Sequence, residues 1–309
     1  MRLSQKVDRS VSYGITKLQN EIYVLWPSSN VISVYEDRYP FRSKKNIEMK
    51  YIQCPFGIGS SGKDRCLYVS DSYKSCIWKI TRETDDQHKI IKWLTTDYTP
   101  DVRSVSSDGH VLMIKDSSHR LMIYGSDAEL IRSIQLPTEI EDPLHAVETS
   151  IGNFIILHKT IFNKNEPIRD LTDSDLVYFV SELSRDGQTV IRCFIPSDKT
   201  QKLNSPRHLS LDSDDRVFVA DFHNRRVILL DSDLKWNQII CPSSSTTTKT
   251  MLYRKTSLTN EEKTPLWPYW PNQWKYSRSW PLSLCYDEEN KQLIAEDCSQ
   301  VYVYTLSRN

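Results

Sequence analysis

The sequence predicts an all-β protein, a six-bladed β-propeller made of four-stranded antiparallel blades. A proline recurs ahead of a short strand, and a nearly continuous apolar run ends about 15–16 residues later. A second apolar run follows in each copy. Uninterrupted copies are spaced about 43–45 residues apart, which is the length of one propeller blade. The recurring prolines are Pro55, Pro100, Pro143, Pro206 and Pro281.

The clearest copy is Ser205–Ile240. Its two central runs, Val217–Ala220 and Val227–Leu230, are apolar at successive positions, as in strands that are covered on both faces. A lone sheet of this size cannot bury two apolar faces. The copies must therefore pack against one another.

The other blades follow from the same pattern. We place them at about residues 10–50, 51–97, 98–138, 139–198, 199–241 and 280–309, as one domain with an aromatic-rich insertion at 242–279. The last copy stops after VYVYTL and lacks a fourth strand. We expect the N-terminal residues 1–8, and in them Arg2–Val7, to supply this strand and so close two open sheet edges.

Both long insertions are predicted on one face of the ring. In an antiparallel blade the turn between the second and third strands shares a face with the link to the next blade. We call this the insertion face. The segments Lys159–Ser174 and Pro242–Ser279 occupy two such connections. Long loops in a tight repeat often carry function.

The second insertion has a polar part and an aromatic part. PSSSTTTKT, residues 242–250, is expected to be mobile. The aromatic part could fold back over the propeller, or it could form an exposed platform for a peptide or single-stranded nucleic acid. Its candidate binding residues are Trp267, Tyr269, Trp270 and Trp274.

Two histidines occupy matching positions in adjacent blades. His145 and His208 each stand two residues after a leading proline, so both should lie near the channel mouth. They could bind a metal, but catalytic zinc usually has three protein ligands, and the matching positions elsewhere offer none. We expect channel-lining histidines and no cofactor, with a metal on this pair as the alternative.

Charged residues recur near the strand ends. The acids after the apolar runs are expected to cap turns through their side chains. They are Asp71, Asp116, Asp221 and Asp297. Arg103, Arg207 and Arg225 are predicted on the insertion face, where they could contact phosphates or an acidic peptide, or form a solvated basic edge.

The best copy resembles a known repeat. Its proline, its acid and the pattern Asp221-x-x-Asn224-x-Arg226 resemble an NHL repeat, and PFGIGSSGKDRCLYVSDSYKSCIWKI resembles it in part. The resemblance implies a recognition propeller, as in the substrate-reading part of NHL-type RING ubiquitin ligases. Ligase activity itself is not expected from these residues, and a longer parent chain stays open.

Composition narrows the function classes. The net charge is zero, with 40 basic and 40 acidic residues, which argues against a surface built uniformly for nucleic acid. There is no apolar run long enough to span a membrane. Seven dispersed cysteines without a Cys-x-x-Cys pair favour a reducing, cytoplasmic setting.

Two functions remain open at this level. The favoured one is a non-enzymatic, monomeric recognition propeller that binds a protein or RNA segment on the insertion face. The alternative is a metal-dependent channel enzyme of the lyase or lactonase type. The usual nucleophile and phosphate-binding motifs are absent from the sequence.

Overall fold

The computed structural model describes residues 14–26, 30–38, 41–84, 87–161, 176–240, 248–252, 282–296 and 301–305. These residues form six antiparallel four-stranded sheets, which confirms the predicted six-bladed propeller. Among them there is no helix that is long and apolar enough to cross a membrane.

The first three blades follow chain order. Blade 1 consists of β1 (Gly14–Leu18), β2 (Glu21–Trp26), β3 (Val31–Glu36) and β4 (Ser43–Glu48). Blade 2 consists of β5 (Pro55–Ser61), β6 (Cys66–Asp71), β7 (Cys76–Arg82) and β8 (His88–Thr95). Blade 3 consists of β9 (Ser104–Val105), β10 (Val111–Lys115), β11 (Arg120–Tyr124) and β12 (Leu130–Gln135).

The next two blades are built in the same way, and the last one differs. Blade 4 consists of β13 (Pro143–Glu148), β14 (Phe154–Ile161), β15 (Leu176–Leu183) and β16 (Val190–Phe194). Blade 5 consists of β17 (Pro206–Leu211), β18 (Val217–Asp221), β19 (Arg226–Leu230) and β20 (Trp236–Ile240). Blade 6 consists of β22 (Ser283–Asp287), β23 (Gln292–Glu296), β24 (Val301–Thr305) and β21 (Thr248–Leu252).

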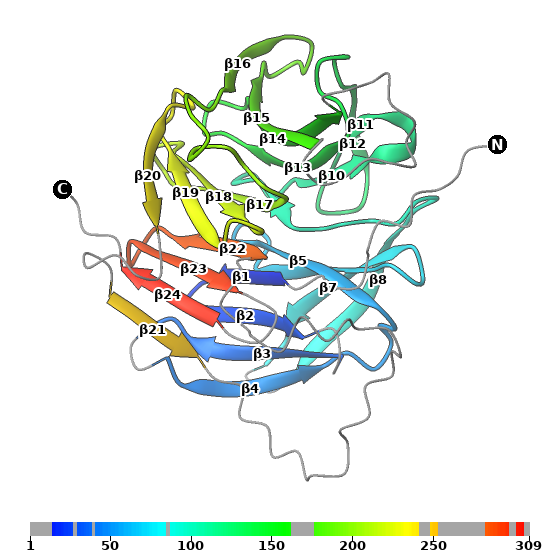
Figure 1. Cartoon of the computed structure of the whole chain (residues 1–309). Helices are drawn as coiled ribbons and strands as arrows, with labels where there is room; N and C mark the ends of the chain where they lie inside the picture. Colours follow the sequence, from blue (N-terminus) through cyan, green and yellow to red (C-terminus); the bar gives the residue numbers. More distant parts are fainter. Residues whose placement is uncertain are drawn as a thin grey trace, which may run out of the picture.

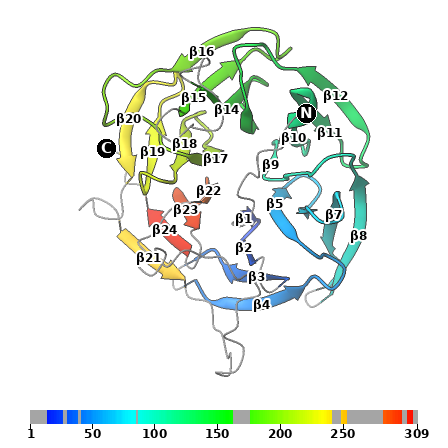
Figure 2. The same ribbon diagram turned by 45° about the vertical axis from the view of Figure 1, so that its right-hand side comes forward.

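The blades circle a common axis. The first strand of each blade is innermost, and it contacts the first strand of the next blade all the way round to β22 and β1. The outer strands β4, β8, β12, β16, β20 and β21 form the rim (Figure 2). The C-terminal end of β14 and the N-terminal end of β15, which flank residues 162–175, lie on the insertion face. The C-terminal end of β21 and the N-terminal end of β22, which flank residues 253–281, lie on the same face.

The apolar core lies between the blades. Among the described residues there are six clusters of buried apolar side chains, and each draws its members from two neighbouring blades. One cluster joins blade 6 to blade 1, through residues such as Ile294 and Ile22. Because both faces of each sheet are covered, the apolar runs at β18 and β19 are buried at nearly every position.

The closing strand is not the one expected from the sequence. The outer position of blade 6 is taken by β21, which pairs antiparallel with β24 from Thr248↔Thr305 to Leu252↔Val301 (Figure 1). The expectation that the N-terminal residues 1–8 close this blade is wrong; those residues lie outside the described part. The expectation of a mobile polar segment is also wrong for residues 248–250. The run TKTML is polar at its first three positions, which an outer strand with one neighbour in its sheet can tolerate.

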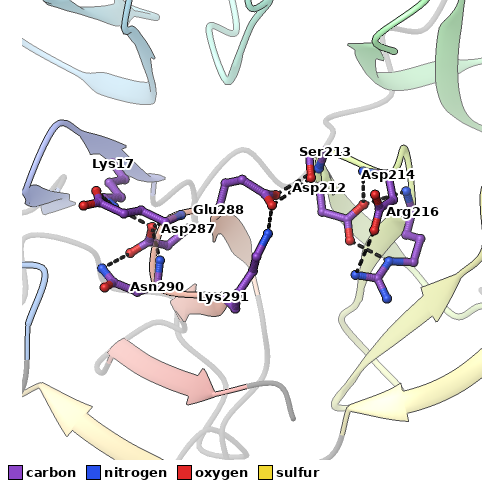
Figure 3. Close-up of polar contacts among 10 residues, drawn as sticks. Lys17, Asp212, Ser213, Asp214, Arg216, Asp287, Glu288, Asn290 and Lys291 are labelled. Atoms are coloured by element: carbon purple, nitrogen blue, oxygen red, sulfur yellow. Dashed lines mark hydrogen bonds and ion pairs between the residues drawn. The ribbon is translucent and has the colours of Figure 1, made fainter. Parts of the chain in front are cut away.

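Polar contacts on the opposite face connect blades 5, 6 and 1. Lys17 of β1 forms ion pairs with Asp287 of β22 and, at 3.1 Å, with Asp37, while Asn290 donates to both carboxylates (Figure 3). Burial would lower the pKa of Lys17, but these two carboxylates outweigh burial and raise it. Ser213, in the β17–β18 turn of blade 5, donates hydrogen bonds to Glu288 of blade 6 and so extends these contacts to a third blade.

Substituting Lys17→Met should destabilise the propeller strongly. Asp37 and Asp287 are almost fully buried, so the variant would leave two carboxylates without their cation. Losing one partner of a buried pair typically costs about 3–5 kcal/mol. We expect chemical denaturation to show a loss of that size.

The control is Lys50→Met, which removes an exposed ion pair with Glu48. Exposed pairs contribute about 0–1 kcal/mol, so this variant should unfold close to the parent. Equal unfolding free energies for the two variants would show that the Lys17 contacts do not hold the ring together.

Candidate functional site

Two of the predicted site residues, His145 and His208, lie on innermost strands just after the leading prolines of blades 4 and 5. The pairing of β13 with β14 shifts register between Pro143 and His145, and β17 shifts in the same way before His208. Proline cannot donate a ladder hydrogen bond, so an irregularity at this point is expected. Both histidines therefore sit at equivalent positions of neighbouring innermost strands.

The two histidines are brought together. Their ring centroids are 4.4 Å apart, and both side chains are buried. The Leu209 N–H donates to Nδ1 of His145 at 3.2 Å, and the Leu284 N–H donates to Nδ1 of His208 at 3.3 Å. Each imidazole thus bridges its own blade to the next one. Because Nδ1 accepts, the proton of the neutral ring is on Nε2.

Burial keeps both rings neutral. It lowers the pKa of His145 to about 3, with a further contribution from the nearby Arg103 guanidinium. Burial also holds the pKa of His208 well below its ordinary value, helped by His145 and Arg103. Neutral imidazoles are what the two backbone N–H donors require.

Arg103 reaches the backbone of blade 5 from the far side of blade 4. Arg103, next to blade 3, forms an ion pair with Asp101 at 3.0 Å and donates from Nη1 to the Arg207 carbonyl at 3.4 Å. Blades 3 and 5 are not neighbours, so this contact places Arg103 near the axis. Burial raises the pKa of Asp101, against the lowering effect of Arg103.

Each of these arginines also lies against an aromatic ring. The Arg103 guanidinium is 5.3 Å from the Phe56 ring centroid, and the Arg207 guanidinium is 5.5 Å from that of Phe222. Such contacts hold a guanidinium group in place while its charge remains. We call Arg103, His145, Arg207 and His208 the axial cluster.

The remaining predicted binding residues are not part of this cluster. Arg225 is exposed in the β18–β19 turn of the insertion face, with φ at 56°. The aromatic candidates lie outside the described residues: Trp267, Tyr269, Trp270 and Trp274.

The repeat signature is structural in blade 5. Asp221 accepts from the Asn204 N–H at 2.7 Å, from Asn224 Nδ2 at 2.8 Å and from Arg226 Nε at 2.7 Å. Asp71 likewise accepts four backbone N–H groups in blade 2. The predicted turn-capping role is observed at these two acids. Asp297 and the Asp116 side chain lie outside the described part.

Sequence reasoning missed an aromatic patch on the insertion face of blade 2. Tyr51 and Tyr73 are 63% and 75% exposed. Lys74 lies over the Trp78 ring at 5.7 Å and donates to the Tyr51 carbonyl at 2.7 Å, while Tyr51 stacks on Trp78. We call Tyr51, Tyr73 and Lys74 the tyrosine patch. The sequence does show Tyr51 shortly before the leading Pro55 and Tyr73 in the turn between β6 and β7, and these positions could have predicted the patch.

The geometry gives little support for a metal centre. No group of three His, Cys, Asp or Glu side chains in the described ranges is arranged to share a metal ion. Nδ1 of both histidines already accepts a backbone N–H, and Arg103 brings positive charge close to them. Nε2 of each ring carries a hydrogen, so the two histidines present hydrogen-bond donors close to the positive charge of Arg103.

Comparison with known proteins identifies the fold. No protein family matches the chain, and no curated protein is significantly similar to it. Solved structures are similar in fold. Hydrazine synthase of Kuenenia stuttgartiensis is 16% identical with a TM-score of 0.59, over 96% of this chain and 84% of that one.

Two lyase structures share the same architecture. A streptogramin B lyase is 11% identical with a TM-score of 0.55, over 96% of this chain and 93% of that one. Selenomethionine-substituted virginiamycin B lyase from Staphylococcus aureus is 12% identical with a TM-score of 0.55, over 99% and 98%. At these identities the similarity establishes the propeller fold alone.

The histidine bridges predict an acid-sensitive fold. Below pH 6.5 these histidines bind protons in the unfolded chain but stay neutral in the folded one. The free energy of unfolding therefore falls as pH falls toward the folded-state pKa. At pH 5 the His145 ring should cost about 2 kcal/mol, and His208 should add a loss in the same direction. We expect the double variant His145→Asn/His208→Asn, whose amide oxygens can still accept, to lose less stability than the parent between pH 7 and pH 5.

Thermal melts at the two pH values measure this difference. His158, whose pKa burial lowers to about 4, contributes equally in both proteins and cancels in the comparison. Parallel losses in parent and variant would show that the paired rings do not govern the acid response.

Proposed function

We propose that this chain is a non-enzymatic recognition propeller that binds a partner segment on its insertion face. A protein segment is favoured over single-stranded RNA, because the net charge is zero and acids such as Asp101 and Asp142 lie among the cations there. The observation that carries the proposal is the exposed tyrosine patch on the insertion face, the face on which the first strands of blades 4 and 5 begin.

Exposed tyrosines suit a binding surface for a physical reason. A tyrosine buries a large area on binding and loses little rotamer freedom, so it is common among residues that dominate interface energies. Lys74 adds a cation over the Trp78 ring, on which Tyr51 stacks. The aromatic segment around Trp270 and Trp274, outside the described part, is proposed to extend this surface.

The resemblance to NHL repeats supports the same proposal. Blade 5 holds the Asp221, Asn224 and Arg226 signature in one hydrogen-bonded network. We propose that the propeller is NHL-like. The most specific function that we propose on this basis is substrate recognition for a ubiquitin ligase system. The five described cysteines are free, which fits the proposed cytoplasmic setting.

Site-specific photo-cross-linking tests which face binds. A cross-linking amino acid at Tyr73 should capture a partner in cells, whereas one at Ile151 should not. Ile151 is similarly exposed, at 68%, but lies in the β13–β14 turn on the opposite face. Equal capture from both positions, or capture from Ile151 alone, would contradict the assignment of the insertion face.

Truncating the patch should weaken the captured complex. With the cross-linked partner identified, Tyr51→Ala and Tyr73→Ala should each raise its Kd about tenfold, because buried aromatic anchors typically contribute more than 1 kcal/mol. Trp270→Ala and Trp274→Ala should act in the same direction without lowering the melting temperature. Binding measured by calorimetry and unchanged in all four variants would argue against an aromatic platform.

A lyase-type enzyme remains the second candidate. The observation that favours it is the closeness of His145 and His208, whose ring centroids are 4.4 Å apart, in a fold shared with streptogramin B lyase. Stoichiometric zinc or another divalent metal in the purified protein, lost in His145→Ala, would support this candidate. Metal content below one-tenth of the protein concentration would favour the recognition propeller.

A further inference from the structure

An open pocket lies between blades 3 and 4, on the face opposite the insertion face. It has a volume of about 460 Å³ and is lined by Arg132 of β12 and by Ser184, Arg185 and Asp186 of the β15–β16 turn. Small-molecule sites usually have volumes of about 300–1,000 Å³. None of these four residues belongs to the axial cluster or to the tyrosine patch.

The pocket is held together by packing across the junction of the two blades. The Arg132 guanidinium of blade 3 is 5.9 Å from the ring centroid of Phe154, a buried residue of blade 4. At Gly187 a Cβ would be 2.2 Å from Cγ2 of Ile134 in β12, so glycine allows the β15–β16 turn to close onto blade 3. The lining residues from the two blades are therefore fixed relative to one another.

Two guanidinium groups supply hydrogen-bond donors. Within the described part of the chain, Arg132 and Arg185 form no ion pair and donate no hydrogen bond. The Arg185 stem lies against Gly152, where a Cβ would be 3.3 Å from its Cδ and Nε. A guanidinium group carries donors only, in a planar arrangement that matches the two oxygens of a carboxylate.

Asp186 supplies a negative charge and an acceptor. Its Oδ1 accepts hydrogen bonds from Ser184 Oγ and, at 3.0 Å, from the Gln188 N–H. The bond from Ser184 is the main cause that lowers the pKa of Asp186, so this carboxylate is ionised at neutral pH. Its Oδ2 accepts no hydrogen bond from the described residues and can accept one from a ligand.

We propose that this pocket binds a small free acid whose carboxylate is accompanied by a hydrogen-bond donor, such as a hydroxy acid. The carboxylate pairs with Arg132 and Arg185, and the donor binds Asp186. Two guanidinium groups and one carboxylate leave a single positive charge, which a monocarboxylate balances. A phosphate group carries a charge of about −1.5 to −2 and three acceptor oxygens, which Asp186 disfavours. The site lies on the other face from the tyrosine patch, so its ligand does not depend on the recognition function.

Lactate and propionate are a matched pair of probes, because they are similar in size and only lactate carries a hydroxyl donor. The full chain is labelled with ¹⁵N, and the backbone amide resonances of residues 184–189 are followed at pH 7.5 during titration with each sodium salt. Sodium chloride at equal ionic strength and inorganic phosphate are titrated in parallel.

Lactate should shift these resonances saturably and bind more tightly than propionate, and chloride should cause no saturable shift. Arg132→Met and Arg185→Met should each raise the Kd for lactate about tenfold, because each removes charge-assisted hydrogen bonds. Arg65→Met is the matched control. Arg65 is exposed in the β5–β6 turn of the same face and does not line the pocket, so this variant should keep the parent Kd. Because Arg185 is exposed, its variant should fold even if Arg132→Met does not.

Several outcomes would overturn the inference. They are the lack of a saturable response to lactate, an unchanged Kd in Arg185→Met, and equal affinities for lactate and propionate. Tighter saturation by phosphate would assign a different ligand class. Acetyl-aspartate amide, whose carboxylate is a peptide side chain, separates a free acid from a protein segment. If it bound about tenfold more tightly than lactate, the ligand would be a protein segment, and Ile151 should then cross-link that partner.

Discussion

The burial of apolar surface between neighbouring sheets is the constraint on which this propeller depends. Every apolar cluster in the described part of the chain spans two blades, including the one that joins blade 6 back to blade 1. A single four-stranded sheet with two apolar faces has no stable form of its own in water. Blade stability is therefore a property of pairs, and closing the ring gives each sheet its second neighbour.

The same constraint decides what can occupy the position two residues after each leading proline. At Gly57 a Cβ would lie 3.0 Å from the Val102 carbonyl oxygen and 2.5 Å from Asp101 Oδ1, so the next blade leaves no room for a side chain. At blades 4 and 5 the equivalent position holds an imidazole that accepts a backbone N–H from the next blade. Ser283 does this for the Ile15 N–H. Glycine, histidine and serine thus fill the space between neighbouring innermost strands in different ways.

Sequence patterns could predict the features that repeat. The blade count, the proximity of His145 to His208 and the capping role of Asp221 all follow from a period shared by several copies. The closing strand could not be predicted this way, because β21 precedes in sequence the three strands of its own sheet. A five-residue outer strand that pairs along one edge has a weak apolar signal. The tyrosine patch was missed because exposure depends on the neighbouring blade.

The distinction between repeated and unrepeated features separates residues that stabilise the ring from residues that are candidates for binding a partner. Arg226 is fixed by Asp221 and by the Thr200 and Lys202 carbonyls, so its matching of a repeat signature has a structural cause. Arg103 and Arg207 match no signature, although they also lie against aromatic rings. A residue required by the repeat recurs wherever the repeat does. Arg103 occurs in one blade, so its contacts with Asp101 and with the Arg207 carbonyl are particular to that part of the ring.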